Sequence, residues 1–243
     1  MTWRSRAKLF GGLLVVIIIV AALTVVFNQR QSQATSVSAS IDAERYPVGI
    51  DYGGTLVASY VKESQRVTAG DVLFTLQSPS LQADLAKGLL KPETVAYSVA
   101  DDGRITLTAA VSGTIRDVTT QPGSFVQAGQ VLATIDKAGS LFVTAQFELT
   151  GREYSRIADS ASVQIQLPNQ ASVVGKVSSI DVQTQHGVAE TTIHITSDGL
   201  ADGAYNGLVN AGTPVTAVLA LTDNGVLAGV IDGISDFLRK IGI

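Results

Sequence analysis

The sequence contains no cysteine, and this absence excludes several kinds of site. Without thiol groups the chain has no disulfide framework, no thiolate metal site, no cysteine nucleophile and no lipid-modified cysteine. Aromatic residues make up 6% and charged residues 16% of the 243 residues, whereas 23 positions are glycine. A chain poor in charge and aromatics but rich in glycine is more typical of a β protein with tight turns than of a helix bundle.

Basic residues are also scarce once the N-terminus is set aside. The first thirty residues hold four basic side chains and no acidic one: Arg4, Arg6, Lys8 and Arg30. The formal net charge of the whole chain is −4, so the remainder of the chain is strongly acidic. Because nucleic acid phosphates require a basic surface, we expect no nucleic acid partner.

The motifs of common catalytic and metal sites are missing as well. His186 and His194 have no acidic or second histidine neighbour at metal-ligand spacing. The sequence has no glycine-rich phosphate loop, no G-x-S-x-G elbow and no HExxH helix. Asp101-Asp102-Gly103 predicts a turn rather than a calcium loop, because the spaced oxygen ligands are absent. The sequence therefore predicts no catalytic residue and no metal site, and a protein that is not an enzyme.

One long uncharged run stands near the N-terminus. Residues 9–27 carry no charge. Folded as a helix with a rise of about 1.5 Å per residue, this run would span the ~30 Å hydrocarbon core of a bilayer. A cleaved signal peptide is the alternative, but its apolar region is usually shorter and a small-x-small cleavage site follows it. The basic residues before the run predict a cytoplasmic N-terminus and an extracytoplasmic remainder. We expect 1–30 to be a stub and single-pass anchor in the cell membrane, and 31–45 to be a flexible polar linker.

The central part of the chain contains an internal repeat. Residues 54–76, GTLVASYVKESQRVTAGDVLFTL, and residues 113–135, GTIRDVTTQPGSFVQAGQVLATI, are 59 residues apart and share their framework. Valine, threonine and isoleucine between glycines and a proline predict strands joined by turns. Since a lone hairpin is only marginally stable, we expect the two copies to pack about a pseudo-twofold axis as one flattened barrel. The structural turn glycines predicted from the repeat are Gly54, Gly70, Gly113 and Gly129, and a positive φ is expected at Gly70 and Gly129.

These residues resemble the split biotinyl/lipoyl-like domain of HlyD-type membrane fusion proteins. The second copy, TAAVSGTI…PGSFVQAGQVLATID, matches that half-domain closely, whereas the first has Ser64 where the second has Gly123. The following segment, LFVTAQFELTGREYSRIADSASVQIQLPNQASVVGKVSSIDV, resembles the β-barrel domain of the same family. The resemblance covers about residues 46–222 and implies a split domain over 46–139 and a β-barrel adaptor domain over 140–222.

The residue pattern of 140–222 agrees with this second domain. Apolar and polar residues alternate along several short runs, which predicts strands with one buried face. The inward positions are Val163, Ile165, Leu167, Thr191, Ile193, Ile195, Val215, Ala217, Leu219 and Leu221. Thr150-Gly-Arg-Glu153 predicts a capping box that opens a short helix around residues 154–157.

The segment between the two copies is short. Relatives in this family often insert a long helical hairpin there, but here only 77–104 intervene. Residues 81–90 predict a helix of two to three turns, which Pro92 ends at Lys91. A stub of that length does not bridge a periplasm, so we expect a bacterium with one membrane or a machine that meets no outer-membrane duct.

A cofactor carrier is the other known use of such a module. In carriers a lysine at the tip of a tight hairpin between the halves receives biotin or lipoate. Lys87 and Lys91 lie between the halves but in a long insertion, and Lys137 follows the second copy. We therefore expect no cofactor, with a measured intact mass as the check.

The C-terminal segment 223–243 predicts an amphipathic helix. Its apolar residues fall on one face, opposite to the charged ones. The proposed partner-docking residues are Leu227, Ile231, Ile234, Phe237, Leu238 and Ile241. The protein's own barrel, the membrane surface and a transporter are all candidate partners, of which we favour the transporter.

The sequence as a whole predicts a mainly β protein with an N-terminal transmembrane helix, a split lipoyl-like barrel or sandwich, a second small β-barrel and a C-terminal amphipathic helix. The resemblance implies a non-catalytic extracytoplasmic adaptor of an ABC-type efflux or secretion transporter. Its partners would be a permease and ATPase, together with further copies in a ring. The alternative is a stand-alone membrane-anchored extracellular binding or cell-wall-associated protein.

Overall fold

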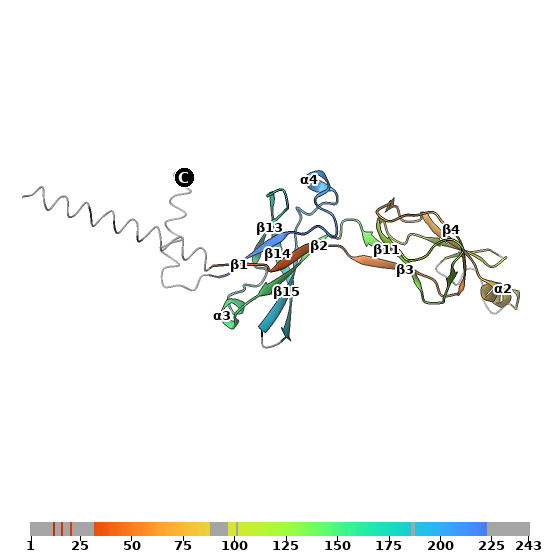
Figure 1. The fold of residues 1–243 in the computed structure, drawn as a ribbon, viewed down its shortest axis with the longest axis horizontal. Helices are drawn as coiled ribbons and strands as arrows, with labels where there is room; N and C mark the ends of the chain where they lie inside the picture. Colours follow the sequence, from red (N-terminus) through yellow and green to blue (C-terminus); the bar gives the residue numbers. More distant parts are fainter. Residues whose placement is uncertain are drawn as a thin grey trace, which may run out of the picture. The chain divides into compact units, whose positions relative to one another are not determined.

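The computed structural model describes residues 12, 16, 20, 32–87, 97–100, 102–185 and 188–222. The predicted C-terminal helix lies outside these residues, as does nearly all of the predicted anchor at 9–27. In the described part of the chain, no helix has the length and apolar character needed to cross a membrane. The described residues form a mainly β structure, as predicted, and divide into two compact units (Figure 1).

The first unit is a sandwich built from residues 42–142 and 201–212. One of its sheets has the antiparallel order β10 (Phe125–Val126), β4 (Gly54–Ser59), β6 (Val72–Gln77), β8 (Arg104–Thr108) and β7 (Ser98–Val99). The other sheet has the order β3 (Arg45–Gly49), β11 (Val131–Lys137), β9 (Gly113–Val118) and β5 (Arg66–Val67). Inward-facing residues of both sheets share one core, among them Leu56, Phe74, Ile105, Ile115 and Ile135.

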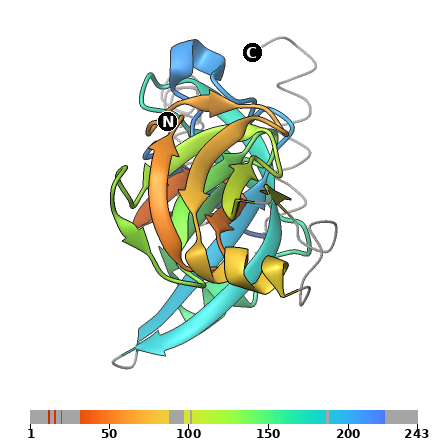
Figure 2. The same ribbon diagram turned by 90° about the vertical axis from the view of Figure 1, so that its right-hand side faces the viewer.

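The segment between the two copies contains one described helix, α2 (Pro79–Ala86). The Ser78 hydroxyl accepts a hydrogen bond from the Leu81 amide. Proline occupies the first helical turn, where a backbone N–H would have no partner within the helix. The helix therefore begins two residues before the predicted start at 81. Leu81 is fully buried in the sandwich core, and Figure 2 shows α2 beside the ends of the sandwich strands.

The second unit, formed by the described residues among 1–41, 143–200 and 213–243, has a seven-stranded sheet. Its order is β1 (Gln33–Thr35), β16 (Thr216–Ala220), β13 (Ser162–Gln166), β14 (Ser172–Gln185), β15 (Val188–Thr196), β12 (Phe142–Glu148) and β2 (Ser38–Asp42). The two edge strands are consecutive in the chain. Ser36 donates its amide to Ala217 on one edge and Val37 donates its amide to Gln146 on the other. The sheet therefore curls until both edges meet at one short segment.

The inward faces of this sheet follow the predicted alternation. Val163, Ile165, Ile193, Ile195 and Leu219 are all fully buried. Helix α3 (Gly151–Tyr154) has the predicted capping box, in which Thr150 and Glu153 each bond the other's backbone amide. The helix begins at Gly151 rather than near Tyr154, because the cap residue is Thr150 itself.

The prediction of a flexible linker at 31–45 is wrong. Residues 33–35 and 38–42 are strands β1 and β2, and Ile41 is fully buried. Small polar residues in this stretch alternate with alanine, valine and isoleucine, and this pattern fits the half-buried edge of a sheet.

Helix α4 (Ala204–Gly207) was not predicted. Its segment 201–212 belongs to the sandwich, although the flanking strands β15 and β16 belong to the other unit.

Candidate functional site

The two copies of the repeat exchange their short strands. In one half β5 pairs with β9, so that Arg66 lies opposite Thr114 and Val67 opposite Gly113. In the other half β10 pairs with β4, with Phe125 opposite Thr55 and Val126 opposite Gly54. Each residue of the first pairing is 59 positions from its counterpart in the second. The prediction that the two copies form one module is therefore confirmed.

The turn hydrogen bonds repeat with the same separation. The Thr68 amide donates to Asp71 Oδ2 at 2.7 Å, and the Gln127 amide donates to Gln130 Oε1 at 3.0 Å. Gly70 and Gly129 lie within these turns, where the sequence predicted a positive φ, and their φ angles are +95° and +81°. Equivalent side-chain acceptors thus hold equivalent turns, although one is a carboxylate and the other an amide.

Gly54 and Gly113 were predicted to be turn residues, but they are the first residues of strands β4 and β9. They allow a close approach of two backbones. A Cβ atom at Gly54 would collide with the Gln77 carbonyl oxygen, and one at Gly113 would collide with the Asp136 carbonyl oxygen. The absence of a side chain, rather than an unusual φ, explains both glycines.

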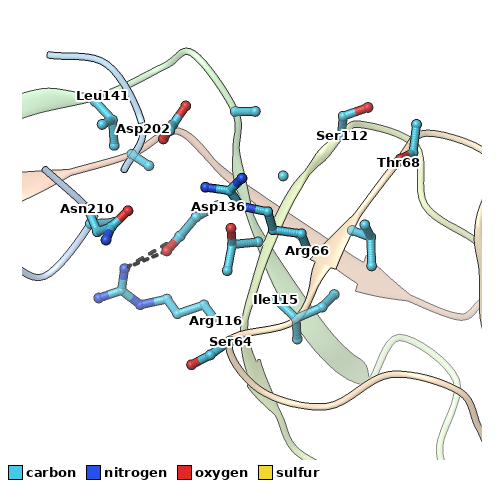
Figure 3. A pocket seen from close by; sticks show the side chains of 16 residues that line it. Ser64, Arg66, Thr68, Ser112, Ile115, Arg116, Asp136, Leu141, Asp202 and Asn210 are labelled. Atoms are coloured by element: carbon cyan, nitrogen blue, oxygen red, sulfur yellow. Dashed lines mark hydrogen bonds and ion pairs between the residues drawn. The ribbon is translucent and has the colours of Figure 1, made fainter. Parts of the chain in front are cut away.

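A groove of about 690 Å³ opens on the outer face of the four-stranded sheet. Its lining comes from β5, β9 and β11 together with the segment 201–212, all within the sandwich unit. Figure 3 shows the side chains of Arg66 and Arg116 in this groove. The Arg116 Nη1 lies 3.2 Å from Asp136 Oδ2, and Asp202 Oδ2 accepts a hydrogen bond from the Gly139 amide at 2.7 Å.

Arg66 differs from the other charged groups of the groove. Among the described residues, no acceptor or acid forms a hydrogen bond or ion pair with its guanidinium. Its Nη2 reaches across to the 201–212 segment, where a Cβ added at Gly203 would lie 3.3 Å from it. Arg66 therefore presents donors that a molecule entering the groove can use.

The lysine of the Asp-Lys-Ala sequence is held in the module rather than presented at a tip. Lys137 lies in β11, its Nζ is 2.9 Å from Glu44 Oε2, and it stands over the Tyr46 ring at 5.7 Å. The hydrogen bond from Lys137 to Glu44 raises the pKa of the lysine above its usual value. Lys87 is the C-cap of α2, and Lys91 lies outside the described residues.

His194 lies on β15 with its Nε2 3.6 Å from Asp181 Oδ2, whereas His186 is outside the described residues. Where the structure describes side chains, it brings together no three histidine, cysteine or acidic residues that could hold a metal ion. The docking residues proposed in 223–243 also lie outside the described part of the chain.

The sequence reasoning missed Arg66, Arg116 and Phe125. All three are positions at which the two copies of the repeat differ. When the copies are aligned, arginine in one copy matches phenylalanine or valine in the other. The residues that the copies share reveal the repeat, whereas these three side chains stand out only at positions where the copies differ.

Residues 57–136 match the CusB barrel-sandwich hybrid domain. Three solved structures have a similar fold. ZneB from Cupriavidus metallidurans has a TM-score of 0.56 at 14% identity over 78% of this chain and 99% of its own. A MacA–MexA chimera containing the Pseudomonas aeruginosa MexA α-hairpin domain has a TM-score of 0.53 at 16% identity over 79% and 83%. MacA from Actinobacillus actinomycetemcomitans has a TM-score of 0.52 at 13% identity over 79% of each chain.

At these identities the structural likeness establishes the fold. No curated protein sequence matches the chain. Together, the domain match and the fold confirm the resemblance to membrane fusion proteins. These are adaptors without enzymatic activity, in agreement with the prediction that the chain is not an enzyme.

Proposed function

We propose that this protein is the extracytoplasmic adaptor subunit of an ABC-type efflux or secretion transporter. One observation carries the proposal: the two copies pair into a single split sandwich, with a separate β unit whose strands flank it in the sequence. This is the domain combination of adaptors, and it offers surfaces for protein partners rather than a catalytic centre.

The placement of the protein in the cell is part of the proposal. The uncharged run at 9–27 would anchor the chain in the cell membrane as a single pass, with the N-terminus in the cytoplasm and the bulk outside. The short segment 78–103 between the sandwich halves, with α2 spanning eight residues, favours a machine without an outer-membrane duct. A bacterium with a single membrane fits both features.

The ABC subclass follows from the sequence resemblance, and co-purification tests it. The tagged full-length chain is extracted in mild detergent, and the proteins retained with it are identified by mass spectrometry. We expect a polytopic permease and an ATPase at a constant ratio to the adaptor. A different class of transporter would reject the ABC assignment while keeping the adaptor role. Retention of no transporter at all would reject the adaptor role and favour the stand-alone binding protein.

A further inference from the structure

The sandwich has two outer faces with the same backbone and different chemistry. On the five-stranded sheet the outward residues beside the exchanged strand are Phe125, Thr55, Val57 and Gln77. At the equivalent places on the four-stranded sheet stand Arg66, Thr114, Arg116 and Asp136. Only the threonine is kept. We call the first set the apolar face and the second set the arginine face.

The apolar face is open to solvent. Phe125 is 68% exposed and Val57 is 52% exposed. Phe125 lies opposite Thr55, so Val57 and Gly53 are its two diagonal neighbours on the adjacent strand, and the tip of its ring lies over Gly53. An exposed phenylalanine next to an exposed valine is a typical anchor of a protein interface.

The arginine face has the complementary form. Arg66 lies opposite Thr114 and has Arg116 as its diagonal neighbour, and the groove of about 690 Å³ lies over them. Arg116 is engaged by Asp136, whereas the Arg66 guanidinium has no partner among the described residues. A guanidinium is attracted to the face of an aromatic ring, and the groove can receive a protruding side chain.

From this complementarity we infer that the apolar face of one copy docks on the arginine face of the next, with Phe125 seated against Arg66. The two faces belong to opposite sheets of one sandwich, so each copy presents both and can bind a neighbour on either side. Such a contact joins unlike surfaces and propagates head to tail, which closes into a ring when the rotation permits it. The inference rests on the adaptor function and adds the residues and the polarity of its assembly.

Cross-linking tests the polarity directly, because the chain has no cysteine of its own. Thr55→Cys marks the apolar face and Thr114→Cys marks the arginine face, and both substitutions leave Phe125 and Arg66 in place. The full-length variants in detergent are treated with a short bismaleimide. We expect covalent dimers when the two variants are mixed and none from either variant alone. A mixture of Thr55→Cys with Thr106→Cys, whose sites share one sheet, is the control that stays monomeric.

A second set of variants tests the contact itself. Phe125→Arg places arginine on both faces and should lower the cross-linked fraction, measured with the cysteine pair, about threefold or more. The double variant Phe125→Arg with Arg66→Phe again places a ring opposite a guanidinium, and it should recover the cross-linked fraction. Because both side chains are exposed, thermal melts of all variants should match the parent.

Several results would overturn the inference. Thr55→Cys that cross-links to itself indicates a twofold contact between like faces. A Thr55→Cys that cross-links only to a co-purified transporter makes the apolar face a transporter site. Absence of dimers in the mixture, with the transporter still retained, rejects the head-to-tail contact and leaves the adaptor function standing. Dimers without any retained transporter reject the adaptor function instead.

Discussion

Ser64 and Gly123 occupy the same left-handed backbone position in the two halves of the sandwich. Their φ angles are +63° and +90°, and each amide bonds to the equivalent strand, Ser64 to the Ile115 carbonyl and Gly123 to the Leu56 carbonyl. A residue with a side chain pays a conformational penalty there that glycine does not. The first copy of the repeat therefore carries backbone strain at this position that glycine avoids in the second copy.

This relationship predicts opposite effects for the two exchanges. Relief of the left-handed strain is worth roughly 1–2 kcal/mol, and the greater freedom of glycine in the unfolded chain costs roughly 0.5–1 kcal/mol. Ser64→Gly should therefore stabilise the sandwich by about 0.5–1 kcal/mol, and Gly123→Ser should destabilise it by a similar amount. Urea unfolding of the two variants checks this. A loss of stability in both would contradict the equivalence of the two positions.

The turn glycines provide a second comparison. Gly70 and Gly129 have positive φ and open space around the position of a Cβ atom. Val at either position is strained only by its backbone, so Gly70→Val and Gly129→Val should each lower the free energy of unfolding by roughly 1–3 kcal/mol. Equal effects are expected, because the two turns are equivalent. If both variants unfold like the parent, the turns do not require glycine.

The strand glycines should respond to a smaller side chain. Gly113→Ala adds one methyl group where the Asp136 carbonyl lies, and Gly54→Ala does the same at the Gln77 carbonyl. Each strand pair must move apart, at a cost of about 1–3 kcal/mol. Alanine at Gly151, which has open space and lies at a helix start, is the matched control and should be nearly neutral. Similar melting temperatures for all three alanine variants would argue against the close approach.

The capping box of α3 predicts a weak dependence of stability on pH. The Thr150 amide and hydroxyl both donate to Glu153 Oε2, at 2.8 and 2.7 Å, and these hydrogen bonds lower the pKa of Glu153. A lowered pKa in the folded state means that the carboxylate stabilises the protein above the pKa it has when unfolded, about 4.3. This contribution is lost as the pH falls through the folded value.

Glu153→Gln should remove that part of the pH dependence, and Thr150→Ala should cost about 1 kcal/mol at neutral pH. Melting temperatures between pH 3 and 7 provide the measurement. The effect is small because Glu153 is only half-buried and solvent screens its interactions. A variant curve that runs parallel to that of the parent over this range would contradict the role of Glu153.

The proposed anchor makes a direct prediction for the mature N-terminus. If 9–27 remain as a membrane span, protein extracted from membranes keeps its first residues. N-terminal sequencing checks this. A mature start between residues 32 and 40 would identify the run as a cleaved signal and exclude the anchor.

The proposed docking helix predicts the effect of truncation after Thr222. Removing 223–243 should leave a folded, membrane-bound protein that no longer co-purifies with the ATPase. Undiminished co-purification would exclude docking on the transporter. Loss of folding, seen as loss of the cooperative melt, would favour packing of this segment on the protein itself.

The sequence predicted those parts of the fold in which local pattern and burial agree. Val163 and Ile165 alternate with glutamines because one face of β13 is buried, and this period of two is visible in the sequence. The repeat revealed the sandwich because equivalent turns need the same residues. The repeat extends beyond the two predicted copies: β3 and β8 begin at Arg45 and Arg104, also 59 residues apart, but the rest of these two strands differs in sequence.

The sequence did not predict features that depend on contacts distant in the chain. Residues 33–42 become strands because β16 and β12 offer them free edges, and a local view shows only a small polar segment. The groove at Arg66 needs the 201–212 segment, which lies more than a hundred residues after Arg66 in the chain. The outer faces could have been found from the sequence by aligning the two copies and reading their differences.

The chain order of the seven-stranded sheet has a consequence for synthesis. Strand β1 pairs with β16, so the first and the last described strands of the chain are neighbours. When the chain emerges N-terminus first, the sandwich strands are all available once β11 has emerged at Lys137, and they can pair before the rest follows. Strand β2 can pair once β12 has followed it, up to Glu148, whereas β1 must wait for β16, which ends at Ala220. During that interval β1 is an exposed edge from which misassembly with another chain would start.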